Sequence, residues 1–518
     1  MKDYRTVYSY AENNKRIARN TFLLYVRMLF NMLVMLYTSR IVLNSLGIEN
    51  YGIYNVVGGV VSLFSCLKNS MITATQRYMT FEIGRGDSMR LNSVFSSSLL
   101  IHLGIGVMVL LLCESIGVWF LNHKMVIPQD RLFAANIVFH LSVLDLFLNL
   151  LSVPYNAIII AFEKMSAFAY ISIVNVILKL LIAFMLFLSP IDILVWYAIL
   201  MLIVSILNNW IYWLYCKKNI KNISFNRSNI NKALGRELFL FASFSFIGDL
   251  AVICYTQGLN VLLNVFFGPI INAARGIAVQ VQGAIGSFSG NFQMAINPQI
   301  TKSYAKGDLT YMRTLVFASS RYSCFLLLVI SLPILIDTDY ILKLWLDIVP
   351  RHSVMFVRLM LLITLIFALS NPPAITVHAT GKIKSYQLVI GGINLLILPI
   401  SYLVLAYGGA PESVFVINLL VLILGLYVRL LYLMPIFKMR LSYYCMEVLM
   451  PILIVSLVSA FIPLILFFNL SESWVRLGMI ILSSVLSVCV SVYVYGITSV
   501  ERAVFNSWIK KLYVYAIR

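Results

Sequence analysis

Charged residues are scarce in this chain of 518 residues. They make up 11% of it, whereas 61% of the residues are hydrophobic. A soluble domain of this size needs far more polar surface, so this composition excludes a soluble globular protein. Apolar runs of eighteen or more residues recur along the whole sequence, and each can cross a hydrocarbon core about 30 Å thick. The composition therefore predicts a polytopic membrane protein built from α-helices.

The sequence also lacks the signatures of a disulfide framework, a metal site or covalent catalysis. Its seven cysteines contain no CxxC pair, and most of them lie inside apolar runs. The five histidines show no ligand spacing. A phosphate-cradling glycine loop, a zinc motif and a nucleophile elbow are all missing from the sequence. We therefore expect no cofactor, no metal and no enzymatic activity.

Fourteen apolar segments are candidate membrane spans. An even number of spans puts both termini on one side of the membrane. The segments are residues 20–42, 51–76, 91–121, 132–152, 167–188, 191–216, 238–267, 270–298, 314–336, 354–377, 386–407, 413–437, 448–468 and 474–496.

The distribution of basic residues indicates which side that is. Of the 39 Lys and Arg residues, 26 fall in the terminal tails and in the loops on the same side as these tails. The opposite loops hold five: Lys124, Arg131, Lys343, Arg351 and Arg476. Cytoplasmic loops collect Lys and Arg, so we expect both termini in the cytoplasm. The same rule explains the net charge of +19, and we expect no nucleic-acid partner.

Two turn motifs recur in register and predict an internal repeat. Gly47 and Gly268 each follow a span, and 221 residues separate them. Gly86-Asp87 and Gly307-Asp308 follow the next spans at the same separation. Six spans per repeat is an even number, so both repeats insert in the same orientation.

The predicted fold is an all-α polytopic membrane protein. It has two six-helix bundles related by a pseudo-two-fold axis along the membrane normal, plus two C-terminal helices. The predicted parts are an N-terminal bundle (1–219), a cytoplasmic linker (220–237), a C-terminal bundle (238–437), and a last part with two spans and an amphipathic tail (438–518). The tail, residues 499–518, repeats apolar residues every four positions and is expected to lie on the membrane surface. Pro372-Pro373 is expected to break or end the tenth span.

The charges within the spans are the most informative feature. Eight basic residues lie there against three acids, Glu114, Asp145 and Asp249. A charge inside the bilayer costs about 2.5–3.5 kcal/mol on insertion scales, so an unpaired excess needs a reason. Some of these cations can reach the headgroups from span ends, as expected for Arg358 and Arg429. The candidates for substrate binding are Arg27, Lys68, Lys179, Arg275 and Arg321.

Helical spacing places several polar residues on shared faces. Arg27 and Asn31 share a face of the first span, and Ser172 and Lys179 share a face of the fifth. The seventh span carries Ser245, Asp249, Thr256 and Asn260, and the eighth carries Arg275, Gln282, Ser289, Gln293 and Asn297. Such stripes avoid lipid, so they predict a water-filled cationic cavity that suits phosphate or carboxylate groups. Asp249 is the candidate for gating or coupling. It either forms a structural ion pair with a span cation, or holds such a cation until substrate displaces it.

Several segments resemble those of polysaccharide repeat-unit flippases, the O-antigen and capsule flippases of the multidrug/oligosaccharidyl-lipid/polysaccharide superfamily. The most specific stretch runs from Leu36-Tyr37-Thr38-Ser39-Arg40 through Leu46-Gly47, Tyr51-Gly52-Ile53-Tyr54 and Ala74-Thr75-Gln76-Arg77 to Gly86-Asp87. The resemblance implies alternating access and transfer of an undecaprenyl-pyrophosphate-linked oligosaccharide from the inner to the outer leaflet of the bacterial inner membrane. It also implies cavity arginines where Arg27 and Arg275 lie, with membrane lipids and polysaccharide assembly proteins as further partners.

Three other functions stay open. A peptidoglycan lipid-precursor flippase would share this chemistry. A multidrug exporter of the same superfamily would share the fold, although exporters of cations favour acidic cavities. A membrane polysaccharide polymerase belongs to a different class and would need a sizeable outer loop with catalytic residues, whereas the longest predicted outer loops have about a dozen residues.

Overall fold

The computed structural model describes residues 2–62, 65–125, 127–220, 223, 225–226, 229–346, 349–499, 501–503 and 506. These residues form helices joined by short turns, and no strand occurs among them. The all-α class predicted from composition is therefore confirmed. The apolar tail positions Val504, Trp508 and Leu512 lie outside the described residues, so the amphipathic surface helix stays a prediction.

The fourteen predicted spans fall mainly on helical residues, although residues 63–64 of the predicted span 51–76 lie outside the described residues. Eleven helical segments are long and apolar enough to cross a membrane, and α1, α2 and α9 are not among them. The helices are α1 (Lys2–Ser62), α2 (Ser65–Arg85), α3 (Ser88–Leu112), α4 (Val118–Lys124), α5 (Leu132–Ala161), α6 (Met165–Met185), α7 (Ile193–Asn219), α8 (Lys232–Phe267), α9 (Pro269–Ala305), α10 (Leu309–Ile336), α11 (Thr338–Leu346), α12 (Ser353–Thr380), α13 (Lys384–Leu395), α14 (Ile397–Ala406), α15 (Ser413–Phe437), α16 (Leu441–Tyr444), α17 (Met450–Asn469) and α18 (Trp474–Ser491).

The repeated glycines all have a positive φ. Gly47 bends α1 at φ +75°, and Gly268 separates α8 from α9 at φ +80°. Gly86 and Gly307 have φ values of +77° and +75°. These angles lie in the left-handed region, which residues with a Cβ adopt at a cost of about 1–2 kcal/mol. Both pairs of glycines that lie 221 residues apart therefore share this unusual backbone angle.

The aspartates that follow these glycines begin the next helices. The Asp87 side chain accepts a hydrogen bond from the backbone N–H of Arg90 at 2.9 Å. Asp308 accepts from the N–H of Tyr311 at 3.0 Å in the same way. Each Gly-Asp pair therefore ends one helix and N-caps the next one.

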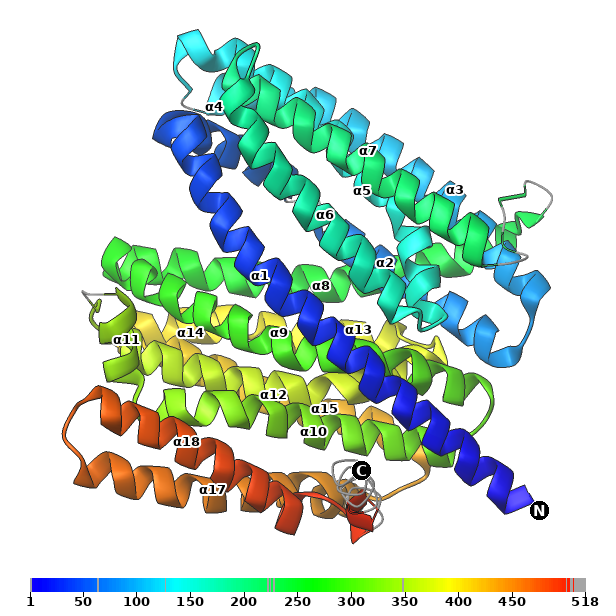
Figure 1. The fold of residues 1–518 in the computed structure, drawn as a ribbon, viewed down its shortest axis with the longest axis vertical. Coiled ribbons are helices and arrows are strands. Elements are labelled where there is room, and N and C mark those ends of the chain that lie inside the picture. Colours follow the sequence, from blue (N-terminus) through cyan, green and yellow to red (C-terminus); the bar gives the residue numbers. More distant parts are fainter. Residues whose placement is uncertain are drawn as a thin grey trace, which may run out of the picture. The chain divides into compact units, whose positions relative to one another are not determined.

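The chain forms two compact units, one comprising Met1–Leu250 with Thr301–Gly307 and the other Ala251–Ile300 with Asp308–Arg518. In the first unit, α5 packs against α1, α2, α3 and α7, and it runs beside α7 in Figure 1. Fully buried Val138 and Phe139 of α5 anchor its core. The predicted division at residues 220–237 stays a prediction.

The second unit is built around α12, which packs against α10 and α15. The buried rings of Phe356 and Phe415, in the first turns of α12 and α15, have centroids 4.5 Å apart. The last two helices, α17 and α18, lie side by side and both contact α10 (Figure 1). Val455 and Ile480 are fully buried in that contact.

The prediction for Pro372-Pro373 is wrong, because α12 continues through both prolines to Thr380. A proline has no N–H, so Pro372 leaves the carbonyl of Ala368 without its helical donor. Gln293 of α9 supplies one, since its Nε2 donates to Ala368 O at 2.8 Å. Its Oε1 accepts from Asn371 at 2.6 Å. The helix survives because a side chain replaces the missing backbone hydrogen bond.

Candidate functional site

Three charged side chains lie close together inside the first unit. Lys68 of α2 and Lys179 of α6 both interact electrostatically with Asp145 of α5, and with each other. Lys68 and Asp145 are partly buried, and Lys179 is exposed. The sequence placed all three residues within predicted spans, and the fold lets them interact from three helices. We call this group the lysine–aspartate cluster; it contains two cations for one carboxylate.

Neutral side chains hold Asp145 in place. Ser205 of α7 donates a hydrogen bond to one carboxylate oxygen, and Asn149 donates to the other at 3.1 Å. Asp145 therefore stays oriented without a direct ion pair to either lysine, which leaves the lysine ammonium groups available to another anion.

Arg27 lies on the side of α1 that packs against α6. Its guanidinium stacks over the ring of Phe168, 4.6 Å from the ring centroid. One turn further on, Asn31 donates to the hydroxyl of Ser172 at 2.9 Å. The two polar faces predicted for the first and fifth spans therefore meet within this unit.

Asp249 accepts a hydrogen bond from a neutral side chain. Ser70 of α2 donates a hydrogen bond of 2.6 Å to its Oδ2. No ion pair joins Asp249 to a cation among the described residues. The ion pair and the gating role that the sequence suggests for Asp249 therefore stay predictions, and among the described residues the acid that interacts with two span lysines is Asp145.

Arg275 is one of the residues that line a pocket in the second unit. Its side chain is 6% exposed. One terminal nitrogen donates to Asn260 Oδ1, and the other donates to the backbone carbonyl of Thr256 at 2.8 Å. The pocket has a volume of about 580 Å³ and is lined by Asn260, Val261, Asn264, Val265, Asn272, Arg275, Gly276 and Val279.

Arg321 is buried in α10, but a carboxylate neutralises it. The guanidinium donates to both oxygens of Glu501, at 2.8 and 3.0 Å. Glu501 also accepts from the N–H of Thr498 at 2.7 Å, and Thr498 Oγ1 accepts from the N–H of Glu501 at 3.3 Å. This reciprocal capping box fixes the start of the C-terminal segment. The charge of Arg321 is thereby explained without a substrate, so we leave this residue out of the proposed site.

An acidic residue that the sequence analysis missed lies in the turn between α5 and α6. Glu163 has φ +57°, and its side chain is fully buried. It pairs with Arg16 of α1 at 2.9 Å and with Lys302, in the last turn of α9, at 2.5 Å. In the sequence, Glu163 could have been noticed because it is an isolated acid in a short turn that is predicted to be cytoplasmic.

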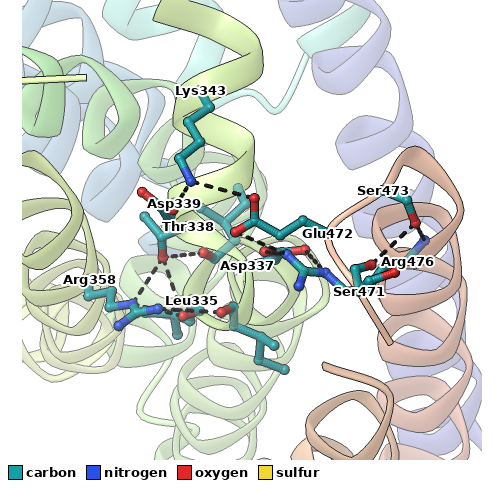
Figure 2. Close-up of polar contacts among 12 residues, drawn as sticks. Leu335, Asp337, Thr338, Asp339, Lys343, Arg358, Ser471, Glu472, Ser473 and Arg476 are labelled. Atoms are coloured by element: carbon teal, nitrogen blue, oxygen red, sulfur yellow. Dashed lines mark hydrogen bonds and ion pairs between the residues drawn. The ribbon is translucent and has the colours of Figure 1, made fainter. Parts of the chain in front are cut away.

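A second network of charges ties α18 to the segment between α10 and α12, as Figure 2 shows. Arg476 donates to both oxygens of Asp337, at 2.7 and 3.1 Å. Burial raises the pKa of the Asp337 carboxyl, and the hydrogen bonds from Arg476 oppose that shift. Arg358 donates to the Leu335 carbonyl and the Thr338 hydroxyl, both at 3.1 Å. These cations therefore serve the packing of helix ends.

Comparison with known proteins gives one weak relative by sequence. No protein-family model matches the chain. The uncharacterized membrane protein EpsK of Bacillus subtilis (strain 168) is 19% identical over 281 residues, which cover 54% of this chain and 55% of EpsK. The match thus spans about half the length of that relative.

Solved structures give a much broader match. A mutant MATE transporter aligns with a TM-score of 0.72 and 13% identity, over 82% of this chain and 97% of its own. An outward-facing multidrug resistance MATE transporter of the MOP superfamily aligns at 0.69 and 14%, over 83% and 96%.

A MOP superfamily transporter from Pyrococcus furiosus also aligns, at 0.69 and 14%, over 83% and 97%. It is described as having a binding pocket of reversed polarity that suggests a different function. The chain therefore has the fold of the MATE transporters, whose two six-helix bundles confirm the predicted fold class.

Proposed function

We propose that this protein is a flippase that moves an undecaprenyl-pyrophosphate-linked oligosaccharide from the inner to the outer leaflet of the bacterial inner membrane. Transport proceeds by alternating access, as in the proposed family. The observation that carries the proposal is the lysine–aspartate cluster, in which Lys68 and Lys179 share the single carboxylate of Asp145 inside a membrane-spanning unit.

The basic residues of the spans differ in whether a nearby group compensates their charge. Arg321 and Arg476 have carboxylate partners, and Arg358 donates to helix-end oxygens. The lysine–aspartate cluster has one more cation than it has anions. Holding an extra cation in a spanning segment is costly, and an incoming diphosphate supplies the missing negative charge. Covalent chemistry is not needed, because the sugar and the pyrophosphate only have to be sheltered from the hydrocarbon.

The MATE fold also supports a second candidate, export of cationic drugs. The charge of the site separates the two candidates. A cationic drug would meet Lys68 and Lys179, whose like charge repels it, whereas an anionic head group is attracted. A peptidoglycan lipid-precursor flippase carries the same head-group chemistry and differs only in the sugar.

The test uses the full-length protein in proteoliposomes. A fluorescent undecaprenyl-pyrophosphate disaccharide is placed in one leaflet, and its exposure to a membrane-impermeant quencher is followed. Fluorescent phosphatidylglycerol, in separate liposomes, reports non-specific scrambling, and ethidium uptake reports drug transport. We expect transfer of the diphosphate-linked lipid alone, and its loss in the Lys68→Gln, Lys179→Gln double variant. Ethidium transport without lipid transfer would establish the exporter instead.

A peptidoglycan precursor and an O-antigen-type repeat unit, offered in parallel, identify the physiological class. Faster transfer of the repeat unit supports the proposal. Exclusive transfer of the peptidoglycan precursor would replace it with the precursor-flippase function.

A further inference from the structure

A histidine and a glutamate join two turns at one end of the second unit. His352 lies immediately before α12, and Glu412 lies immediately before α15. The imidazole Nδ1 is hydrogen-bonded to Oε1 of the Glu412 carboxylate, although 60 residues separate the two in the chain. The side chains are 24% and 23% exposed, so solvent reaches the pair but screens it less than a fully exposed one. Both turns belong to the loops that the sequence predicts to lie outside the cell.

The backbone of His352 is in a conformation that histidine adopts at a steric cost. Its φ is +71°, in the left-handed region, where glycine and asparagine are tolerated more readily. Such a conformation persists only where the surroundings hold it. Here the imidazole stacks on the ring of Phe356, with centroids 6.0 Å apart, and pairs with the carboxylate of Glu412. The contacts of the side chain therefore offset the cost of the backbone angle.

The pair adjoins the buried contact between α12 and α15. The His352 carbonyl accepts a hydrogen bond from the N–H of Phe356 at 3.0 Å, and the Glu412 carbonyl accepts from the N–H of Phe415 at 3.0 Å. Each member of the pair thus begins the first turn of a helix, and the rings of Phe356 and Phe415 meet in these two turns. A change in the strength of the pair therefore acts on the first turns of two helices that pack together.

The charge of this pair changes with pH. Histidine is the side chain whose charge ordinarily changes between pH 5 and 8. A protonated imidazole makes an ion pair with the carboxylate, whereas a neutral one makes only a hydrogen bond, which is weaker. Other charged groups lie on the elements beside the turn. They are Arg351, next in the chain, Asp339 and Lys343 of α11, which pair with each other, and Asp337, which pairs with Arg476.

We propose that His352 and Glu412 form a pH-sensitive clamp on the ends of α12 and α15 that are predicted to face the outside. In an acidic medium the imidazole is protonated, and the ion pair holds the two turns together. In a neutral or alkaline medium the ion pair is lost, and the left-handed backbone of His352 loses part of its support. The first turns of α12 and α15 then open more often. This property does not depend on which substrate the protein carries.

The test measures amide hydrogen exchange of the full chain in nanodiscs, without substrate, at about pH 5.5 and about pH 8. The readout is the protection factor of residues 351–357 and 411–416, which corrects each rate for the intrinsic pH dependence of exchange. His352→Asn keeps an amide that can donate to the carboxylate, tolerates the left-handed angle and does not titrate. Glu412→Gln removes the charge of the acid. His140→Asn is the matched control, because His140 also pairs with an acid, Glu114, but does so in the first unit.

We expect the wild-type protection factor of both segments to fall about two- to fivefold from the acidic to the alkaline condition, as the loss of a partly exposed ion pair implies. In His352→Asn and Glu412→Gln the protection factor should be nearly the same at both pH values, and His140→Asn should behave as wild type does. Equal protection of the wild-type protein at both pH values would overturn the clamp. The same fall in His352→Asn as in wild type would assign the pH effect to another group and would also overturn it.

Discussion

Lys302, in the last turn of α9, donates a 2.5 Å hydrogen bond to Glu163, a fully buried carboxylate in the turn between α5 and α6. Arg16 of α1 reaches the other oxygen of the same carboxylate at 2.9 Å. The side chain of Lys302 is 13% exposed, so little water can screen this contact. One acid therefore joins three segments that are far apart in the sequence.

Replacing Glu163 by Gln should strongly destabilise the protein. The change removes the carboxylate charge and leaves Lys302 buried without its counter-ion. Breaking a buried pair in this way typically costs about 3–5 kcal/mol. The measurement is the thermal unfolding midpoint of the purified protein in detergent.

The matched control is Asp192→Asn, which removes the acid that pairs with Arg131 at 2.5 Å. Both side chains of that pair are partly exposed, so its loss should cost less than about 1 kcal/mol. Equal midpoints for Glu163→Gln and wild type would show that the buried pair contributes no net stability.

Replacing Asp145 by Asn should strengthen the binding of an anionic ligand. The carboxylate competes with an incoming diphosphate for Lys68 and Lys179, and Asn keeps the shape without the charge. We expect affinity for a prenyl pyrophosphate to rise about tenfold at low salt, with a smaller gain at high salt. Glu114→Gln is the control, because that acid pairs with His140 outside the lysine–aspartate cluster. Weaker binding by the Asp145 variant would mean that the carboxylate orients the lysines and does not compete with the ligand.

Arg321 and Glu501 should behave as a structural pair. Glu501→Gln retains groups that can cap the helix start, yet it leaves the buried Arg321 without its counter-ion, so stability should fall. The Arg321→Gln, Glu501→Gln double variant should lose less than the sum of the two single losses, with a coupling of about 0.5–3 kcal/mol. Unfolding midpoints give the cycle, and prenyl pyrophosphate affinity is measured in parallel. Weaker pyrophosphate binding by a stable Arg321→Gln protein would restore the substrate role predicted from sequence.

The sequence predicted those features of the fold that depend on neighbouring residues in the chain. Long apolar runs predicted the helices, and Gly86-Asp87 predicted a turn because the motif carries its own geometry. The partners of charged side chains depend on packing between distant segments, so they did not follow from periodicity. Helical spacing put Asp249 near the middle of its span, but only the fold gives it Ser70 as a partner.

The glycines of the repeat should resist substitution because of their backbone angles. Gly86→Ala and Gly307→Ala place a Cβ at φ +77° and +75°, and each should cost about 1–2 kcal/mol. Gly104→Ala is the control with the opposite sign. Gly104 lies inside α3, and an added Cβ there meets nothing within 4 Å, so alanine should be neutral or stabilising. The thermal unfolding midpoint is measured for all three variants. Wild-type midpoints for Gly86→Ala and Gly307→Ala would show that the two turns adjust to an added Cβ without a loss of stability.

The Asp249→Asn variant tests the gating role that the sequence suggests for Asp249. An acid that exchanges a cation with substrate would lose transport when neutralised. The structure instead gives this carboxylate a hydroxyl donor, Ser70, at 2.6 Å. Asn can accept the same hydrogen bond, and its neutral amide is less costly to bury than a carboxylate. We therefore expect normal membrane abundance, an equal or higher unfolding midpoint, and transfer of the diphosphate-linked lipid at the wild-type rate. Ser70→Ala serves as the partner control and should lower the midpoint only in the presence of the native Asp249. Loss of transfer by an abundant and stable Asp249→Asn protein would return Asp249 to the transport mechanism, through a proton or an ion and not through a paired cation.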